Sequence, residues 1–174
     1  MSIKTWFTSD THFGHTNIIK FCNLPFENAQ EMDEEIIHNW NRVVGKEDIV
    51  YHLGDVSFRN KQETISIFKQ LNGRKHLIQG NHDPIDIMKE CFHSVEPYKH
   101  LRNYNNYKKD LVLFHYPIES WNKKFHGSIH LHGHSHGTAL KMKNRFDLWT
   151  GDWKMTPVLL EDILEMVDLG ETVG

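Results

Sequence analysis

The chain has 174 residues, of which 39% are hydrophobic and 25% charged, the composition of an ordinary globular protein in water. This length is sufficient to bury a substantial core, and we expect a single domain spanning residues 1–174. The formal net charge of −3 excludes a general attraction to nucleic acid or to anionic membranes, and no apolar run approaches the roughly 20 residues of a membrane span.

The first half alternates strand patterns with helix patterns. In chain order we expect a strand at residues 3–9, helices at 17–21 and 28–43, a strand at 47–53, a helix at 60–73, a strand at 75–79 and a helix at 85–91. Two of these helices begin with the spacing of a capping box, Asn28 with Glu31 and Asn60 with Glu63. The alternation predicts βαβ units.

The second half consists mainly of strand patterns. In chain order we expect strands at 99–104 and 110–115 around a turn at Asn105-Asn106, then strands at 127–132, 144–149 and 157–160, and a final helix at 161–167. βαβ units followed by a hairpin-rich half predict an α/β protein in which two sheets pack face to face, with helices on the outside.

The cysteines and the N-terminus point to a cellular location. Cys22 and Cys91 are too few for a disulfide framework and do not form a zinc-type pair. The first seven residues lack the apolar core and cleavage site of a signal peptide. We therefore expect a protein of the reducing cytoplasm.

Histidine is over-represented, with 14 residues, and several histidines stand with carboxylates where strand patterns end. The motifs in question are Asp10-Thr11-His12, Gly54-Asp55, Gly80-Asn81-His82-Asp83, His115 and Gly133-His134-Ser135-His136. The carboxyl ends of strands are where α/β proteins present chemistry. In a strand, residues two apart face the same way, so we expect Asp10 with His12, and His134 with His136, to point inward together.

These residue types indicate a metal centre. Any one motif by itself is typical of a polar surface loop, but five in succession predict a shared site. Carboxylates, an amide oxygen and imidazoles suit a pair of borderline divalent ions such as Mn²⁺, Fe²⁺ or Zn²⁺. They do not suit Ca²⁺, which prefers oxygen ligands throughout.

The order of the motifs, D-x-H, G-D, G-N-H-D, H and G-H-x-H, resembles that of the calcineurin-like metallophosphoesterases. The resemblance extends over residues 10–136, most of the chain. It implies a four-layer α/β/β/α sandwich in which two mixed β-sheets pack face to face between flanking helices. It also implies a dinuclear metal centre at one edge of the β-sandwich.

The resemblance implies a role for each motif residue. Asp10, His12 and His136 would hold the first ion, Asp55 would bridge, and Asn81, His115 and His134 would hold the second. The implied cofactors are two divalent ions, Mn²⁺ foremost, with Fe, Zn, Ni or Co as alternatives. A hydroxide that bridges the ions would attack phosphorus in line. His82 would act as general acid or hydrogen-bond donor, oriented by Asp83.

Further residues are candidates for substrate contacts. Asn17 follows the first motif, and His15 is close enough in sequence to reach a substrate at the first ion, although a structural role weighs equally. Arg59 is able to clamp a phosphate, with an exposed salt bridge as its competing role. Tyr116 follows His115 and would shape the mouth of the site.

The function that we expect is hydrolysis of a phosphodiester, and also of monoesters, in a small, nucleotide-type substrate. The short chain leaves little room for a cap domain before Asp10 or after His136, which favours a modest substrate. A nuclease for short or single-stranded nucleic acid is the first alternative, although the acidic charge argues against a stable nucleic-acid complex. A non-catalytic scaffold is the second alternative. The presence of a suitable residue at every ligand position argues against it.

Overall fold

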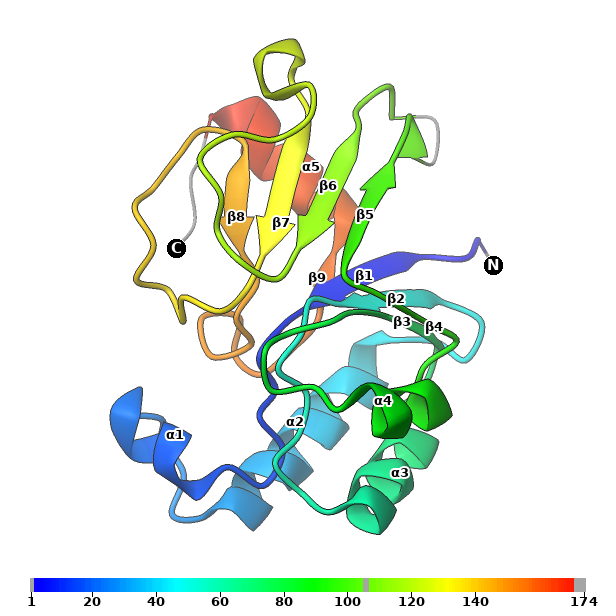
Figure 1. The fold of residues 1–174 in the computed structure, drawn as a ribbon, viewed down its shortest axis with the longest axis vertical. Helices are drawn as coiled ribbons and strands as arrows, with labels where there is room; N and C mark the ends of the chain where they lie inside the picture. The colour runs from blue at the N-terminus through cyan, green and yellow to red at the C-terminus, as the bar shows by residue number, and fades with distance from the viewer. Residues whose placement is uncertain (1, 105–106, 171–174) are drawn as a thin grey trace.

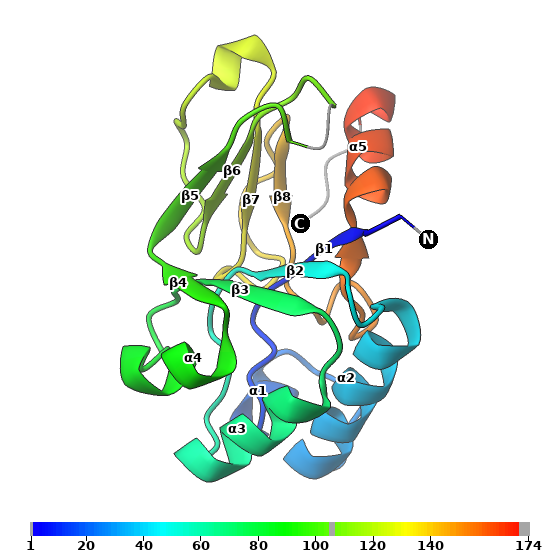
Figure 2. The same cartoon turned by 90° about the vertical axis from the view of Figure 1, so that its right-hand side faces the viewer.

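The computed structural model describes residues 2–104 and 107–170, which form two β-sheets and five α-helices (Figures 1 and 2). The first sheet has the order β4-β3-β2-β1-β9 and the second the order β5-β6-β7-β8. The strands of the first sheet are β1 (Thr5–Thr8), β2 (Ile49–His52), β3 (Arg74–Ile78), β4 (Ser94–Glu96) and β9 (Val158–Leu159). Those of the second are β5 (Tyr98–Leu101), β6 (Leu111–Phe114), β7 (Ile129–His132) and β8 (Arg145–Asp147).

The helices are α1 (Thr16–Phe21), α2 (Ala29–Val43), α3 (Lys61–Gln70), α4 (Ile85–Cys91) and α5 (Leu160–Leu169). Helices α2 and α3 begin at the two caps that the sequence predicts, Asn28 and Asn60. Asn60 and Glu63 form a complete capping box at α3. At α2 the side chain of Asn28 accepts the N–H of Glu31, but the Glu31 carboxylate accepts the N–H of Glu27 instead of that of the cap residue.

Alternation along the strands divides the apolar residues between two cores. In β1, Trp6 belongs to the core under α1–α4, whereas Phe7 belongs to the core between the two sheets. Helices α1–α4 lie on the face of the first sheet that is turned away from the second (Figures 1 and 2). Helix α5 packs Ile163 and Leu164 into the core between the sheets. The expected fold class, an α/β sandwich of two mixed sheets with flanking helices, is confirmed.

The second half differs from the expected run of hairpins. In the second sheet β5 and β6 pair antiparallel, whereas β6, β7 and β8 are parallel to one another. Connections between parallel neighbours must return along the sheet, so the segment after β7 is a long loop instead of a hairpin turn. Strand β4 was not predicted, and the turn expected at residues 105–106 lies outside the described residues. Within residues 2–104 and 107–170, no helix has the length and apolar character needed to cross a membrane.

The two sheets meet beside the end of β1. The N–H of Ser9 donates to the carbonyl of Leu148, and the carbonyl of Ser9 accepts the N–H of Thr150. Strands β1, β2 and β3 are parallel neighbours, as are β6 and β7. Their carboxyl ends therefore approach one another at one edge of the sandwich, and the five polar motifs follow these strand ends.

A buried histidine supports the loop that follows β2. His52 is fully buried, and its Nδ1 accepts the N–H of Gly54 at 3.2 Å. The ring proton therefore lies on Nε2, which donates to the hydroxyl of Thr11 at 3.0 Å, and that hydroxyl donates to the carbonyl of Val56. Burial, and then the charge of a protonated His115, lower the pKa of His52 to about 3. His52 is thus a neutral support for this loop.

We expect His52 to make folding sensitive to mild acid. The unfolded chain takes up a proton near pH 6.5 and the folded His52 only near pH 3, so stability is complete above pH 6.5 and falls below it. The single residue should remove about 2 kcal/mol between pH 6.5 and 4.5. Denaturant unfolding across this range should show a shallower pH slope for His52→Gln than for the wild type. His38→Gln, at an exposed position, is the matched control, and equal slopes for all three proteins would contradict the assignment.

Candidate metal centre

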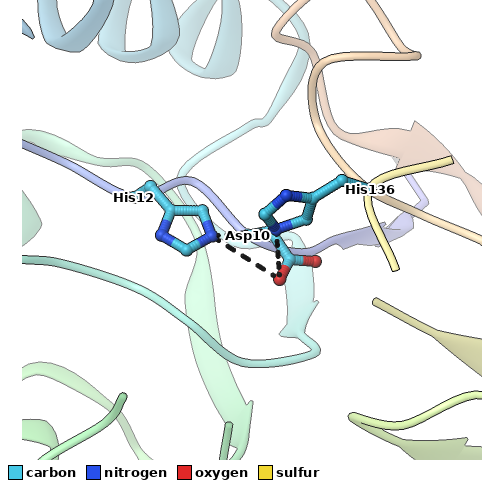
Figure 3. A group of neighbouring side chains, drawn as sticks. All are labelled: Asp10, His12 and His136. Carbon is cyan, nitrogen blue, oxygen red and sulfur yellow. Dashed lines mark hydrogen bonds and ion pairs between the residues drawn. The ribbon is translucent and has the colours of Figure 1, made fainter. Parts of the chain in front are cut away.

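Asp10, His12 and His136 form a first group of metal-ligand type (Figure 3). The Nε2 atoms of His12 and His136 face each other at 3.1 Å. They lie 3.8 and 3.5 Å, respectively, from Oδ1 of Asp10, which is almost fully buried. Residues from the loop after β1 and the loop after β7 thus contribute to one group.

Asp55, His115 and His134 form a second group. Nε2 of His115 lies 3.6 Å from Oδ1 of Asp55 and 3.0 Å from Oδ1 of Asn81. Nδ1 of His115 is 2.7 Å from the carbonyl of Leu53, which makes it the donor nitrogen. The lone pair of Nε2 is consequently directed at the Asp55 and Asn81 oxygens. Such a backbone bond fixes the tautomer in which a histidine binds metal.

Backbone hydrogen bonds hold the two groups side by side. The N–H of His134, from the second group, donates to the Asp10 carboxylate of the first at 3.0 Å. The N–H of Asp10 donates to the carbonyl of Gly54, and the N–H of His12 donates to that of Asp55. The seven residues that the resemblance implied as ligands are therefore gathered at one place.

The ligand residues have an unusual backbone. The φ angles of Asp10, His12, Asp55, His134 and His136 lie between 46° and 66°. Side chains other than glycine rarely occupy this left-handed region, and such strain concentrates at functional sites. The alternation that we expected, with residues two apart pointing the same way, is therefore not what aims these side chains. His134 and His136 even belong to different groups.

The glycines of the motifs permit the close packing of these loops. A Cβ atom on Gly133 would lie 2.2 Å from Oδ2 of Asp10, and one on Gly80 would lie 2.3 Å from Oδ1 of Asp55. On Gly54 it would lie 2.5 Å from Nδ1 of His115. In each case the glycine of one motif lies against a ligand residue of another, so any larger residue would separate the loops.

The electrostatics suit a cation. Burial, followed by the charge of His136, lowers the pKa of His12 to about 2, which keeps His12 neutral as metal binding requires. Burial also opposes protonation of His136, but the hydrogen bond and charge of Asp10 outweigh it and raise its pKa. Imidazole nitrogens that face each other beside a buried carboxylate repel unless a proton or a metal ion lies between them.

The donor set fits a divalent ion of the borderline class. Each group combines imidazole nitrogens with a carboxylate oxygen, the mixture that such ions prefer. Within the described chain, the buried Nδ1 of His12 has no hydrogen-bond partner, so only ring packing and the contacts at Nε2 hold this imidazole.

His82 and Asp83 have different environments. His82 is exposed beside the second group, and its N–H donates to Oδ1 of Asp55 at 3.0 Å. Asp83 is buried, and its carboxylate accepts the N–H groups of Asp55, Val56 and Gly80 at 2.8–2.9 Å. Asp83 therefore braces the loops that carry the ligands, and its influence on His82 passes through the backbone instead of through the expected contact with the ring.

The three candidate substrate contacts differ in placement. The ring of His15 packs face to face on that of Phe58, with centroids 4.2 Å apart, close to the ring of His12. Asn17 is exposed on α1. Arg59 donates from Nε and NH2 to Asp33 at 3.0 and 2.8 Å, and it lines a hollow of about 310 Å³ between α2 and α3. Its guanidinium is thus engaged by a buried carboxylate.

Sequence reasoning missed several neighbours of the ligands. Asp147 accepts the hydroxyl of Ser135 and the N–H of Gly137, and so braces the loop after β7. Sγ of Cys22 lies 3.6 Å from Nδ1 of His136. The buried ring of Trp149 stacks on the ring of His136, with centroids 5.3 Å apart. These residues are distant in sequence from the motifs and follow no recognisable spacing.

Comparisons with known proteins agree with this geometry. The model of the calcineurin-like phosphoesterase family matches residues 3–162. An uncharacterized protein of Methanocaldococcus jannaschii is 37% identical, covering 98% of this chain and 94% of its own length. The Gene 66 protein of Mycobacterium phage L5 is 31% identical over 79% of each chain. The crystal structure of a protein of unknown function, AQ665 from Aquifex aeolicus, superposes with a TM-score of 0.75 at 26% identity, covering 95% of this chain and all of its own.

The close approach at Gly133 predicts that Gly133→Ala weakens metal binding. The added methyl group must displace the Asp10 carboxylate, and changes next to ligands weaken metal affinity by roughly ten- to hundredfold. Titration of the metal-free protein with Mn²⁺, followed by calorimetry, measures the effect, while circular dichroism checks the fold. Gly45→Ala is the matched control, because its Cβ would approach Asp48 no closer than 3.3 Å. Unchanged Mn²⁺ affinity in Gly133→Ala would show that the packing constraint is not real.

Proposed function

The chain belongs to the calcineurin-like phosphoesterase family, and we propose that it is a metal-dependent hydrolase that cleaves phosphodiesters, and also monoesters, of a small substrate. The observation that supports this most strongly is the pair of ligand groups held side by side, with an exposed histidine next to them. The proposed cofactors are two divalent ions, Mn²⁺ foremost. Asp10, His12 and His136 would hold one ion, and Asn81, His115 and His134 the other, with Asp55 between them.

The residues divide the chemistry between them. The ions, when bound, would lower the pKa of water and neutralise charge on the phosphate. His82 is exposed to the substrate side, and its backbone is fixed to Asp55, so the imidazole would donate a proton or a hydrogen bond to the departing oxygen. Asp83 and Asp147 would keep the ligand loops in place during the reaction.

A small ester is the proposed partner, in the cytoplasm. The two free cysteines, Cys22 and Cys91, fit a reducing compartment. The net charge of −3 supports small substrates over stable complexes with nucleic acid. Each motif position assigned to a metal ligand carries a residue type that is able to bind metal. This favours an enzyme over a scaffold that retains only the fold.

His82→Ala should retain the metal ions but slow hydrolysis by roughly 10²- to 10⁴-fold. The loss should be greatest for esters with poor leaving groups, because these most need a proton. A series of aryl phosphodiesters of graded leaving-group acidity, assayed with Mn²⁺, measures this dependence. His126→Ala, at an exposed position away from the motifs, is the control. Loss of bound metal in His82→Ala would make His82 a ligand and refute its proposed role.

Asp55→Ala should lower the occupancy of both metal positions, because one bridging carboxylate serves two ions. Metal analysis after dialysis against a defined Mn²⁺ concentration gives the number of ions per chain. Asn81→Ala is the comparison, since its amide oxygen lies in the second group alone. If Asp55→Ala and Asn81→Ala lose the same single ion, Asp55 does not bridge.

A further inference from the structure

Two exposed aromatic rings flank the ligand groups. Phe58 and Tyr116 are 43% and 37% exposed, respectively, although both are in contact with the rings of metal-ligand residues. Each ring stands beside a different group: Phe58 beside His12 of the first group, and Tyr116 beside His134 of the second. An apolar ring on each side of an otherwise polar site indicates a binding surface for the substrate.

Phe58 is held rigidly in its position. Its N–H donates to the carbonyl of Phe13 at 2.8 Å, and its ring packs parallel to that of His15, with an interplanar angle of 14°. The ring of His82 lies 5.1 Å away, tilted by 47°. A ring that is already ordered loses little entropy when a flat group stacks on it. Phe58 therefore lies on the side of the site where His82 would act on the leaving group.

Tyr116 lies beside the second group. Its ring centroid lies 4.9 Å from that of His115 and 4.7 Å from that of His134. The chain behind it is anchored by the buried His130, whose Nε2 lies 3.2 Å from the carbonyl of Tyr116. This ring is therefore fixed next to the second group, as Phe58 is next to the first.

We propose that Phe58 and Tyr116 are two stacking subsites, and that the enzyme selects phosphodiesters with a planar aromatic group on each side, such as a small dinucleotide. This inference rests on the proposed phosphoesterase function. A phosphodiester has two organic substituents, which leave the phosphorus in different directions. The leaving side would stack on Phe58, near His82, and the retained side on Tyr116. Arg59, a candidate for clamping phosphate in the sequence, forms instead the competing salt bridge, with Asp33, so ring contacts are the better-supported source of selectivity.

Two pairs of substrates test the two rings separately. Thymidine 5′-(p-nitrophenyl phosphate) and methyl p-nitrophenyl phosphate share a leaving group, so the ratio of their kcat/KM values reports on the retained side. Tyr116→Ala should lower this ratio about tenfold, the usual strength of base stacking on an aromatic ring. Phe58→Ala should lower both kcat/KM values and leave the ratio unchanged.

The second pair examines the leaving side. Methyl phosphodiesters of a phenol and of a fluorinated alcohol of matched acidity differ in the planarity of the leaving group and little in its chemistry. Phe58→Ala should reduce the preference for the phenol about tenfold, and Tyr116→Ala should not. Phe58→Leu and Tyr116→Leu, which keep side-chain volume but lose the flat ring, should behave as the alanine variants do. Tyr116→Phe should behave as the wild type, and so should Phe125→Ala, a 91% exposed ring outside the ligand loops.

The outcomes separate this inference from the function on which it rests. If the wild-type protein with Mn²⁺ cleaves none of these esters, the proposed function and the stacking subsites are both wrong. If it cleaves them, but neither ratio changes in the Phe58 and Tyr116 variants, the hydrolase remains and the subsites are refuted. Metal content and the midpoint of thermal unfolding, equal to those of the wild type, confirm that each variant is folded and loaded.

Discussion

The site depends on close contact between glycine backbones and the ligand residues of neighbouring loops. Gly54, Gly80 and Gly133 each lie where a Cβ atom would come within 2.5 Å of a ligand side chain from another motif. At Gly54 and Gly80, rotation of the ligand side chains alone would not relieve the overlap, because the added Cβ atoms would also meet the backbone of Gly80 and of Asp55, respectively. The glycines thus determine how near the loops from two sheets come to one another, and hence whether the two ligand groups form.

Buried carboxylates also stabilise these loops, by accepting hydrogen bonds from their backbone N–H groups. Asp83 binds the N–H groups of three loop residues, and Asp147 binds those of Gly137 and Trp149. Asp33 binds the N–H of Gly14 and the guanidinium of Arg59, next to the first motif. Each carboxylate satisfies backbone groups that would otherwise be buried without partners, at a cost of about 1–3 kcal/mol each. Asp83 thereby holds the left-handed backbone of Asp55 directly, and the other bonds fix residues next to the candidate ligands.

The arrangement connects folding with function. The backbone of the candidate ligand residues is strained and fixed by hydrogen bonds between loops, so these residues are positioned before any ion or substrate arrives. The same rigidity extends to the rings of Phe58 and Tyr116, which border the groups on either side. The two candidate ligand groups, His82 and the two exposed rings thus belong to one surface, built from the ends of five strands.

The sequence by itself determined the α/β class and the polar motifs at the strand ends, because these depend on local patterns, and the order of the motifs identified the family. Strand and helix periodicity placed α4 at its observed bounds, and glycine with aspartate or histidine after a strand marked each ligand loop. The pairing of His12 with His136 was available only through family resemblance, since the two are 124 residues apart. Tertiary structure alone decided which aspartates brace loops and which face the ligand groups. Asp83 and Asp55 have the same side chain after similar strands, and only the packing of other loops directs one carboxylate to backbone amides and the other to His115. That packing joins residues across the chain, so no local pattern encodes it.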